Sequence, residues 1–190
     1  MVVTRWGARF MGRRFPVSIG RTGFTQDKRE GDGATPAGVW RLMGGGYRAD
    51  RGLPPRVPFL MRAIGPQGLW SDDPGVPEYN HDVRAPYPHS HERLFRADGL
   101  YDIVLVTDWN WPEAVPGKGS AIFVHVWRGP RQPTAGCLAF RADHLRWILG
   151  RWTPRSRIFV GEALFKGLAH SSHRATASEE GAETPMSAQP

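Results

Sequence analysis

The apolar residues of this chain fall into short runs that glycine and proline separate. Tyr101–Thr107 is a nearly continuous apolar run with β-branched residues, which is typical of a buried central strand. Phe15–Gly20 alternates apolar and polar positions, and this period of two predicts a second strand that ends at a glycine. Further strands are expected at Met1–Phe10, Val39–Leu42, Ala121–His125 and Arg157–Val160.

Helical signals are confined to one short segment. Asp143–Gly150 begins with a capping aspartate, has helical apolar spacing and ends at a glycine, so it predicts a short helix. Residues 47–100 are rich in proline and show no clear period, and we expect this segment to cover one side of a cleft. The pattern predicts a mainly β domain with one or two short helices over residues 1–167, followed by a disordered tail at 168–190.

Composition supports a single domain that is cut into short segments. The chain has 190 residues with 23 Gly and 17 Pro, which is long enough for one real core but short for two. Its formal charge is +7, and almost all of the positive charge is arginine. Because arginine binds phosphates and carboxylates with a planar fork, the partner classes are nucleic acid, an anionic membrane surface or a carboxylate polymer. The scatter of the arginines is equally compatible with a compositional bias that has no binding role.

The same composition bears on the compartment. One cysteine excludes an intramolecular disulfide framework. The N-terminal residues contain no apolar stretch of the length of a secretory signal, and no apolar run approaches a membrane span. From the sequence alone we therefore expect a cytoplasmic protein with no membrane span.

The sharpest candidate chemistry lies between Ser120 and Phe140. His125 follows an apolar strand, the chain then breaks at Gly129-Pro130, and Cys137, the only cysteine, follows a glycine. Strands joined by such a loop can lie side by side, and a thiol beside a base is the minimum equipment for nucleophilic acyl transfer. An imidazolium at His125 would keep Cys137 ionised near neutral pH, and backbone amides of the turn before Cys137 would stabilise an oxyanion.

Each of these residues also has an interpretation without catalysis. Cys137 could be a small buried apolar residue, and His125 could be a histidine of the core with satisfied hydrogen bonds. A metal cluster built from His81, His89 and His91 with neighbouring carboxylates matches no strong zinc spacing, so we expect neither a metal nor a cofactor. His91 and Glu92 are expected to brace a loop or to orient a substrate group.

The order of these residues resembles a known family. His125, a loop and then Thr134-Ala135-Gly136-Cys137 are similar to the signature of the YkuD-type L,D-transpeptidases, and Gly31–Gly38 resembles their upstream Thr-Pro-x-Gly segment. The short, divergent bacterial branch is most similar, with matching segments around Tyr79-Asn80 and Ser90-His91-Glu92. The resemblance implies a mixed β-sandwich, and it makes Tyr79, Asn80, His91 and Glu92 candidates for orienting the substrate.

The resemblance also implies a reaction. Cys137 would attack the carbonyl of the third residue of a peptidoglycan tetrapeptide stem and release D-alanine, with His125 as base and then acid. Gly136 and Cys137 amides would lie at the oxyanion, Thr134 would take the family's Ser/Thr place, and Ala135 would belong to the same support. An amine of a second stem would then accept the acyl group and form a cross-link. The partners would be peptidoglycan stem peptides or muropeptides, and the family implies the periplasm or cell envelope.

Two departures and two rival functions accompany this interpretation. Ala135 stands where the family usually has a second histidine, with His91 as a candidate substitute, and Ala139 stands where an Asn or Arg is common. The first rival is an L,D-carboxypeptidase, in which water replaces the amine and trims stems during muropeptide recycling. The second is a basic binding module with an inert Cys137, for which the chain shows no nucleic-acid motif.

Overall fold

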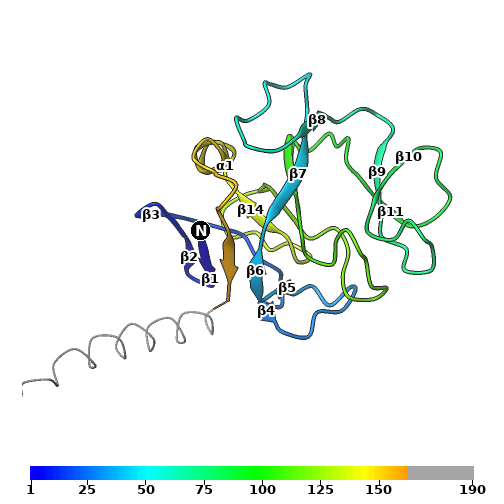
Figure 1. Cartoon of the computed structure of the whole chain (residues 1–190), viewed down its shortest axis with the longest axis horizontal. Coiled ribbons are helices and arrows are strands. Elements are labelled where there is room, and N and C mark those ends of the chain that lie inside the picture. Colours follow the sequence, from blue (N-terminus) through cyan, green and yellow to red (C-terminus); the bar gives the residue numbers. More distant parts are fainter. Residues whose placement is uncertain (162–190) are drawn as a thin grey trace, which may run out of the picture.

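The strands of the protein form two five-stranded sheets and two smaller ones. In the computed structural model, which describes residues 1–161, a single short helix lies among fifteen strands (Figure 1). This confirms the mainly β fold class that the sequence predicts. The remaining part of the predicted domain, 162–167, and the predicted tail, 168–190, lie outside the described residues.

The N-terminal sheet has the strand order β3-β2-β1-β15-β6. Its strands are β1 (Val2–Thr4), β2 (Gly7–Phe10), β3 (Arg13–Phe15), β15 (Ile158–Val160) and β6 (Gly38–Trp40). One face is buried because alternate positions are apolar, and Phe15, Ala8, Val3 and Val160 line up in register on it. The first and last strands of the described residues are therefore neighbours, with β1 parallel to β15.

The central sheet has the order β14-β13-β12-β7-β8 and mixes parallel and antiparallel pairs. Its strands are β14 (Leu138–Phe140), β13 (Phe123–Val126), β12 (Ile103–Thr107), β7 (Leu42–Tyr47) and β8 (Met61–Ala63). Alternate residues of β12 enter two different clusters. Ile103 and Leu105 pack into the main core with the N-terminal sheet, whereas Val104 packs into a second cluster on the other face. The expectation of a buried central strand at Tyr101–Thr107 is confirmed.

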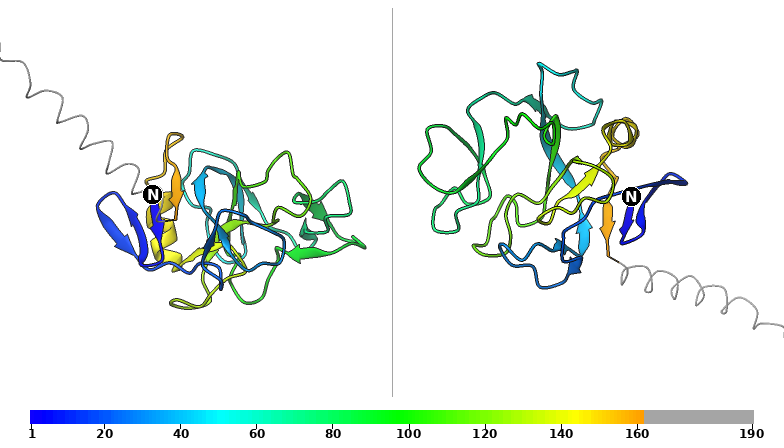
Figure 2. Two further views of the ribbon diagram at one scale, coloured as in Figure 1. Left: turned by 90° about the horizontal axis from the view of Figure 1, so that it is seen from below. Right: turned by 180° about the vertical axis from the view of Figure 1, so that it is seen from behind.

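The second face of the central sheet is covered by the proline-rich segment. There β9 (Gly68–Ser71) pairs with β10 (Asp82–Arg84) and β11 (His91–Arg93) in a small sheet. Trp70 of β9 meets Phe123 of β13 edge to face, with ring centroids 5.1 Å apart. Figure 2 shows this small sheet and its loops standing on the side of the molecule away from β1–β3.

The remaining elements are short. The pair β4 (Phe24–Thr25) and β5 (Thr35–Pro36) forms a parallel two-stranded ribbon beside the glycine-rich loop. Helix α1 (Ala142–Leu149) buries Leu145, Ile148 and Leu149 against the main core. The expected helix is confirmed, although Arg141 rather than Asp143 precedes its first residue, and Asp143 lies in the first turn.

Two expected strands are interrupted, each for a local reason. Met1–Phe10 was expected to be one strand, but it is a hairpin that turns at Arg5-Trp6, and Gly7 takes the φ of +136° that the turn requires. Phe15–Gly20 was expected to be another, but β3 ends at Phe15. Pro16 cannot donate to a ladder, so only isolated bridges follow at Ser18 and Gly20.

The run Gly44-Gly45-Gly46 in β7 lets the proline-rich segment and β12 approach the central sheet closely. A Cβ at Gly45 would lie 2.4 Å from the carbonyl oxygen of Val104 and 2.9 Å from Leu105 Cδ1. A Cβ at the preceding Gly44 would meet only the Leu60 carbonyl oxygen, at an ordinary 3.5 Å.

We expect Gly45→Ala to lower the free energy of unfolding by about 3 kcal/mol, because the clash with backbone forces the central strands apart. Gly44→Ala is the matched control, and it should change stability by less than about 1 kcal/mol. Urea denaturation of both variants measures the difference. Equal stability of the two variants would contradict the packing described for β7.

Candidate functional site

A pocket of about 330 Å³ opens on the second face of the central sheet. Its walls come from the glycine-rich loop around Gly31, from the proline-rich segment at Asp72 and Glu92, and from the ends of β13 and β14. His125, Thr134, Ala135, Gly136 and Cys137 all line it. The structure therefore brings together the residues that the sequence places at the centre of the chemistry, and the segment 47–100 covers one side as expected.

Cys137 lies directly before β14 and is held by the neighbouring strand. Its Sγ donates to the carbonyl oxygen of Ala121 at 3.1 Å and accepts from the Phe123 amide at 3.4 Å. The Cys137 residue is 9% exposed and lies at the floor of the pocket. Both contacts come from the chain just before or within β13, so they fix the thiol against that strand.

The turn before Cys137 is stabilised by its own hydroxyl and by a close backbone contact. Thr134 Oγ1 donates to the Cys137 carbonyl at 2.7 Å and accepts from the Gly136 amide at 3.2 Å. Gly136 has φ of +149°, and a Cβ there would lie 2.9 Å from the carbonyl oxygen of Ala34. Glycine is therefore required at this position. The Gly136 amide, expected at an oxyanion, is already bonded to Thr134 in this arrangement.

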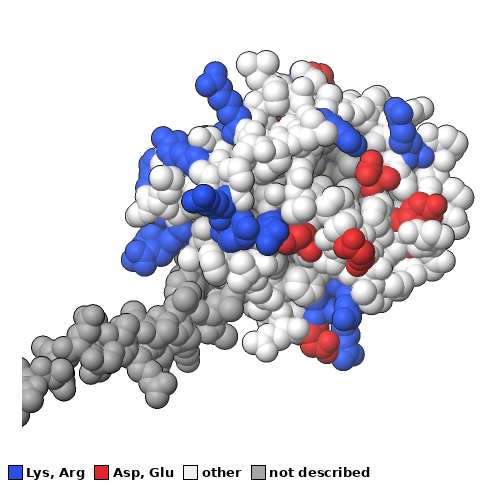
Figure 3. Space-filling model, viewed as in Figure 1, with Lys and Arg blue, Asp and Glu red and all other residues white. Residues whose placement is uncertain are grey.

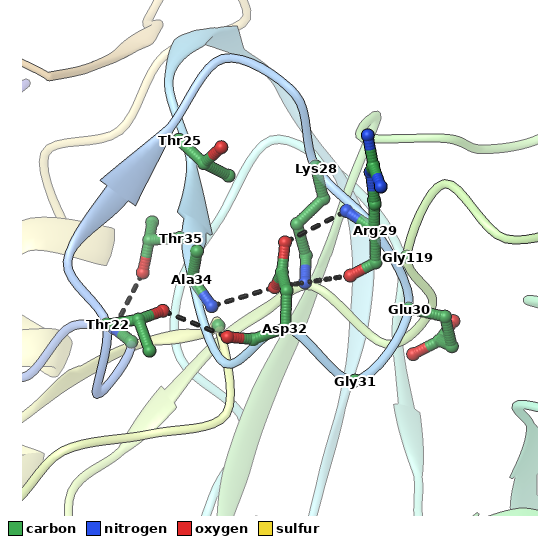
Figure 4. Close-up of polar contacts among 12 residues, drawn as sticks. Thr22, Thr25, Lys28, Arg29, Glu30, Gly31, Asp32, Ala34, Thr35 and Gly119 are labelled. Carbon is green, nitrogen blue, oxygen red and sulfur yellow. Dashed lines mark hydrogen bonds and ion pairs between the residues drawn. The ribbon is translucent and has the colours of Figure 1, made fainter.

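The glycine-rich loop is fastened by a single carboxylate. Asp32 accepts from the amides of Arg29 at 2.9 Å and Ala34 at 2.8 Å and pairs with the Lys28 ammonium (Figure 4). Burial alone would raise the pKa of Asp32, but these donors hold it below its usual value. The loop thereby presents Ala34 to Gly136 and places the buried Lys28 side chain at the pocket.

A second backbone connection fixes the same turn from the N-terminal side. The backbones of Ser18 and Ala139 form two hydrogen bonds with each other, at 2.8 and 2.9 Å. The Thr134 amide donates to the Ile19 carbonyl at 2.9 Å. The isolated bridges that replaced the expected strand at Phe15–Gly20 thus join the chain after β3 to both ends of the turn that carries Cys137.

His125 lies on the same face of the central sheet as the thiol. In the parallel pairing of β13 with β14, His125 is opposite Ala139 and Val124 is opposite Leu138. Alternation then places Phe123 and His125 on the face of Cys137, which is the face of the pocket. His125 Nδ1 lies 2.7 Å from the Val126 carbonyl oxygen. Since a carbonyl only accepts, the neutral ring carries its proton on Nδ1 and keeps a lone pair on Nε2.

Burial sets the charge state of both side chains. Desolvation lowers the pKa of His125 to about 4. Desolvation also raises the pKa of the Cys137 thiol to about 12, and Glu92 adds to this shift while Lys28 opposes it. Both groups are therefore neutral near pH 7. This differs from the thiolate–imidazolium pair suggested by the sequence, and the reason is the removal of both groups from water.

Tyr101 and Glu92 form a further wall that the sequence did not single out as a unit. The Tyr101 ring meets the His125 ring edge to face, with centroids 5.2 Å apart, and Tyr101 and Glu92 both line the pocket. Burial raises the pKa of Glu92 even though Arg96 pairs with it at 2.7 Å. Tyr101 and Arg96 are far from Cys137 in sequence. Only the aromatic ring of Tyr101 and the charge of Arg96 could have suggested that they belong to the site.

The other predicted residues divide between the pocket and the structure around it. His91 and Glu92 point to opposite faces of β11, so Glu92 lines the pocket with Cys137, whereas His91 lines a second pocket with Tyr87 and Arg93. His91 is therefore not placed to substitute for a histidine at Ala135, which is itself exposed at the pocket. Ala139 is buried in the floor.

Tyr79 and Asn80 are buried behind the wall of the pocket. Tyr79 donates to Glu30 at 2.6 Å. Asn80 Oδ1 accepts from the Trp70 indole and from the Ala121 amide, each at 2.9 Å. Asn80 therefore positions Ala121, whose carbonyl accepts the hydrogen bond from the thiol, and its contribution to the site is indirect.

The described part of the chain offers neither a metal-binding cluster nor a membrane-spanning helix. Residues 1–161 contain no group of three or more His, Cys, Asp or Glu side chains arranged to hold a metal ion. No helix in the same part of the chain has the length and apolar character to cross a membrane.

Comparison with known proteins gives one result. A family model described as the YkuD L,D-transpeptidase catalytic domain matches residues 7–160. This range includes the whole central sheet, every strand of the N-terminal sheet except β1, and every residue of the pocket. No curated protein and no solved structure matches the chain.

Because Cys137 is the only thiol, alkylation reports on it alone. We expect iodoacetamide to modify the native protein at pH 7 at least about 100-fold more slowly than the protein in guanidinium chloride, since burial suppresses the thiolate. The native rate should rise about tenfold per pH unit from pH 7 to pH 9. Faster modification of the native protein than of the unfolded one would contradict a neutral thiol, and loss of that fast reaction in His125→Gln would identify an ion pair instead.

The lowered pKa of His125 also predicts a dependence of stability on pH. The unfolded chain binds a proton at His125 below about pH 6.5, whereas the folded chain does so only near pH 4. Protonation of His125 therefore favours the unfolded chain. The free energy of unfolding is unaffected by His125 above about pH 6.5 and decreases as the pH falls from 6.5 towards 4. Between pH 7 and pH 5 the loss should be about 2 kcal/mol. Urea denaturation at both pH values measures it, and His125→Gln should lack this part of the loss. An identical pH dependence of the two proteins would show that His125 titrates normally.

Proposed function

Since the chain belongs to the YkuD family of L,D-transpeptidase catalytic domains, whose activity is directed at peptidoglycan, we propose that it is a cysteine-dependent L,D-transpeptidase of tetrapeptide stems. The observation that carries the proposal is the common face of β13 and β14. A thiol and an imidazole with a lone pair on Nε2 line one pocket there.

In the proposed reaction, Cys137 Sγ attacks the carbonyl carbon of the third stem residue while its proton passes to His125 Nε2. The tetrahedral intermediate then collapses to a thioester, and His125 returns the proton to the nitrogen of the departing D-alanine. An amine of a second stem attacks the thioester, which forms the new amide and restores the thiol. Bonds and protons balance over the two steps, and neither step needs a cofactor.

The neutral starting state decides how the thiol is activated. A pKa near 12 for the thiol and near 4 for the imidazole make a full ion pair unfavourable before the substrate enters. Proton transfer is therefore coupled to the attack on the carbonyl, when negative charge moves from sulfur to oxygen. The thiol must also release the Ala121 carbonyl that it contacts in the unreacted site.

The cations of the pocket have separate roles in this proposal. Lys28 pairs with Asp32 and Arg96 pairs with Glu92 and Asp98, so these two fix the walls. Arg21 and Arg128 are exposed at the pocket and are suited to the carboxylates of a stem peptide. They would supply the carboxylate binding that Ala139 cannot.

Incubation of the purified protein with disaccharide-tetrapeptide tests the reaction, with products separated and identified by mass spectrometry. We expect dimers that have lost one D-alanine and are joined through the third residues of two stems. Cys137→Ala should reduce this product by at least about 10³-fold, because the nucleophile is lost. Arg62→Gln, an exposed change on β8, is the control and should retain the parent rate.

Two outcomes would overturn the proposal. Tripeptide as the only product would mean that water accepts the acyl group and that the enzyme is a carboxypeptidase. Undiminished activity in Cys137→Ala would remove the thioester from the mechanism altogether.

A further inference from the structure

The N-terminal sheet presents a second face whose residues do not enter the core. In register across the five strands, this outer row reads Arg14, Arg9, Val2, Phe159 and Val39. The inner positions beside it are buried, whereas every member of the outer row is half-buried or exposed. The row is cationic at the β3 end and apolar at the β6 end.

Charge on this side of the molecule is mostly positive, and the exposed Asp143 of α1 is paired with Arg141. Residues 1–26 contain arginine but no aspartate or glutamate, and the same holds for residues 144–161. The arginines of these two segments are Arg5, Arg9, Arg13, Arg14, Arg21, Arg146, Arg151, Arg155 and Arg157. In Figure 3 basic side chains gather on the side where β1–β3 and α1 lie, and the acidic ones gather mostly over the small sheet and its loops.

Two of these arginines are placed where their charges destabilise the sheet. Arg9 on β2 and Arg14 on β3 are directly opposite one another in the antiparallel pair, and both are exposed. Like charges at opposed positions of a sheet destabilise it. An anion bound between the two guanidinium groups removes this repulsion, and a phosphate diester matches their planar donors.

Large apolar side chains accompany the arginines. Trp6, in the turn between β1 and β2, is 79% exposed, and Arg5 stacks over its ring at 5.1 Å. Met11, in the turn between β2 and β3, is 66% exposed, and Val39 of the outer row is 48% exposed. Tryptophan beside arginine is the composition of residues that lie at the boundary between lipid headgroups and acyl chains.

We propose that the outer face of the N-terminal sheet binds the surface of an anionic phospholipid bilayer. Arg9 and Arg14 bind lipid phosphates, while Trp6, Met11 and Val39 enter the boundary below them. Nucleic acid would use the arginines but would leave the aliphatic members of the face without a partner, so the observations favour lipid. The proposal does not depend on the reaction assigned to Cys137.

The layers of the fold make this attachment compatible with an open pocket. The main core lies between the N-terminal sheet and the central sheet, and the pocket lies on the far face of the central sheet. In a protein attached through the outer row, the pocket therefore faces away from the bilayer. A peptidoglycan polymer on that side could reach it.

Cosedimentation of the full chain with vesicles tests the proposal. We expect binding to vesicles of phosphatidylglycerol and phosphatidylcholine in equal parts, weaker binding as salt is raised, and little binding to phosphatidylcholine alone. The double variant Arg9→Gln/Arg14→Gln should bind about 25-fold more weakly, because each arginine near an anionic surface contributes about fivefold. Trp6→Ser should weaken binding at unchanged charge.

The matched control removes the same charge elsewhere. Arg62 and Arg84 are exposed on β8 and β10, away from β1–β3 (Figure 1), so Arg62→Gln/Arg84→Gln should change binding less than about threefold. The thermal midpoint of Arg9→Gln/Arg14→Gln should equal or exceed that of the parent, since the opposed charges are gone. This separates lost binding from lost folding.

Three results would overturn the proposal. The first is parent-like binding by Arg9→Gln/Arg14→Gln, and the second is equal binding to vesicles without anionic lipid. The third is a duplex oligonucleotide that binds more tightly than the vesicles and displaces them, which would assign the face to nucleic acid.

Discussion

The parallel pairing of β13 with β14 is the constraint on which the rest of the site depends. It sets His125 opposite Ala139 and puts the thiol, two residues earlier, on the same face as the imidazole. A shift of one residue would turn Cys137 into the main core, because side chains alternate along a strand. The register is held from three directions: by the Thr134 hydroxyl, by the contact of Gly136 with Ala34, and by the two bonds between Ser18 and Ala139.

The same packing that fixes this geometry removes both the thiol and the imidazole from water. Burial favours a neutral thiol and a neutral imidazole, and a neutral thiol reacts slowly with oxidants and alkylating reagents. The hydrogen bond from His125 to Val126 keeps the base in the tautomer that can accept a proton. In the proposed reaction, activation of the thiol then depends on a substrate that changes the surroundings of Cys137.

The sequence was sufficient for features whose cause is local. The glycine before Cys137, the apolar run of β12 and the capped helix α1 each follow from a few adjacent residues, and the signature around His125 identified the family. The interruption of the strand expected at Phe15–Gly20 was harder to predict, although Pro16 indicated that the strand could not continue. Tyr101, Arg96 and Lys28 reach the pocket through contacts distant in sequence, so no local pattern could place them. His91 lies in a second pocket, away from the thiol, because one residue along a strand reverses the face.

Arginines that are scattered in the sequence fall into distinct groups in the fold. Arg9 and Arg14 belong to the outer face of the N-terminal sheet, whereas Arg21 and Arg128 lie at the pocket. The chain passes from the first group to the pocket within a few residues of β3, by way of the bridges at Ser18 and Gly20. If the basic character were only a compositional bias, the repulsion between the opposed Arg9 and Arg14 would destabilise the sheet with no compensating interaction. The proposed attachment to an anionic surface would offset that repulsion, and the proposed reaction assigns Arg21 and Arg128 of the pocket to the carboxylates of the stem peptide.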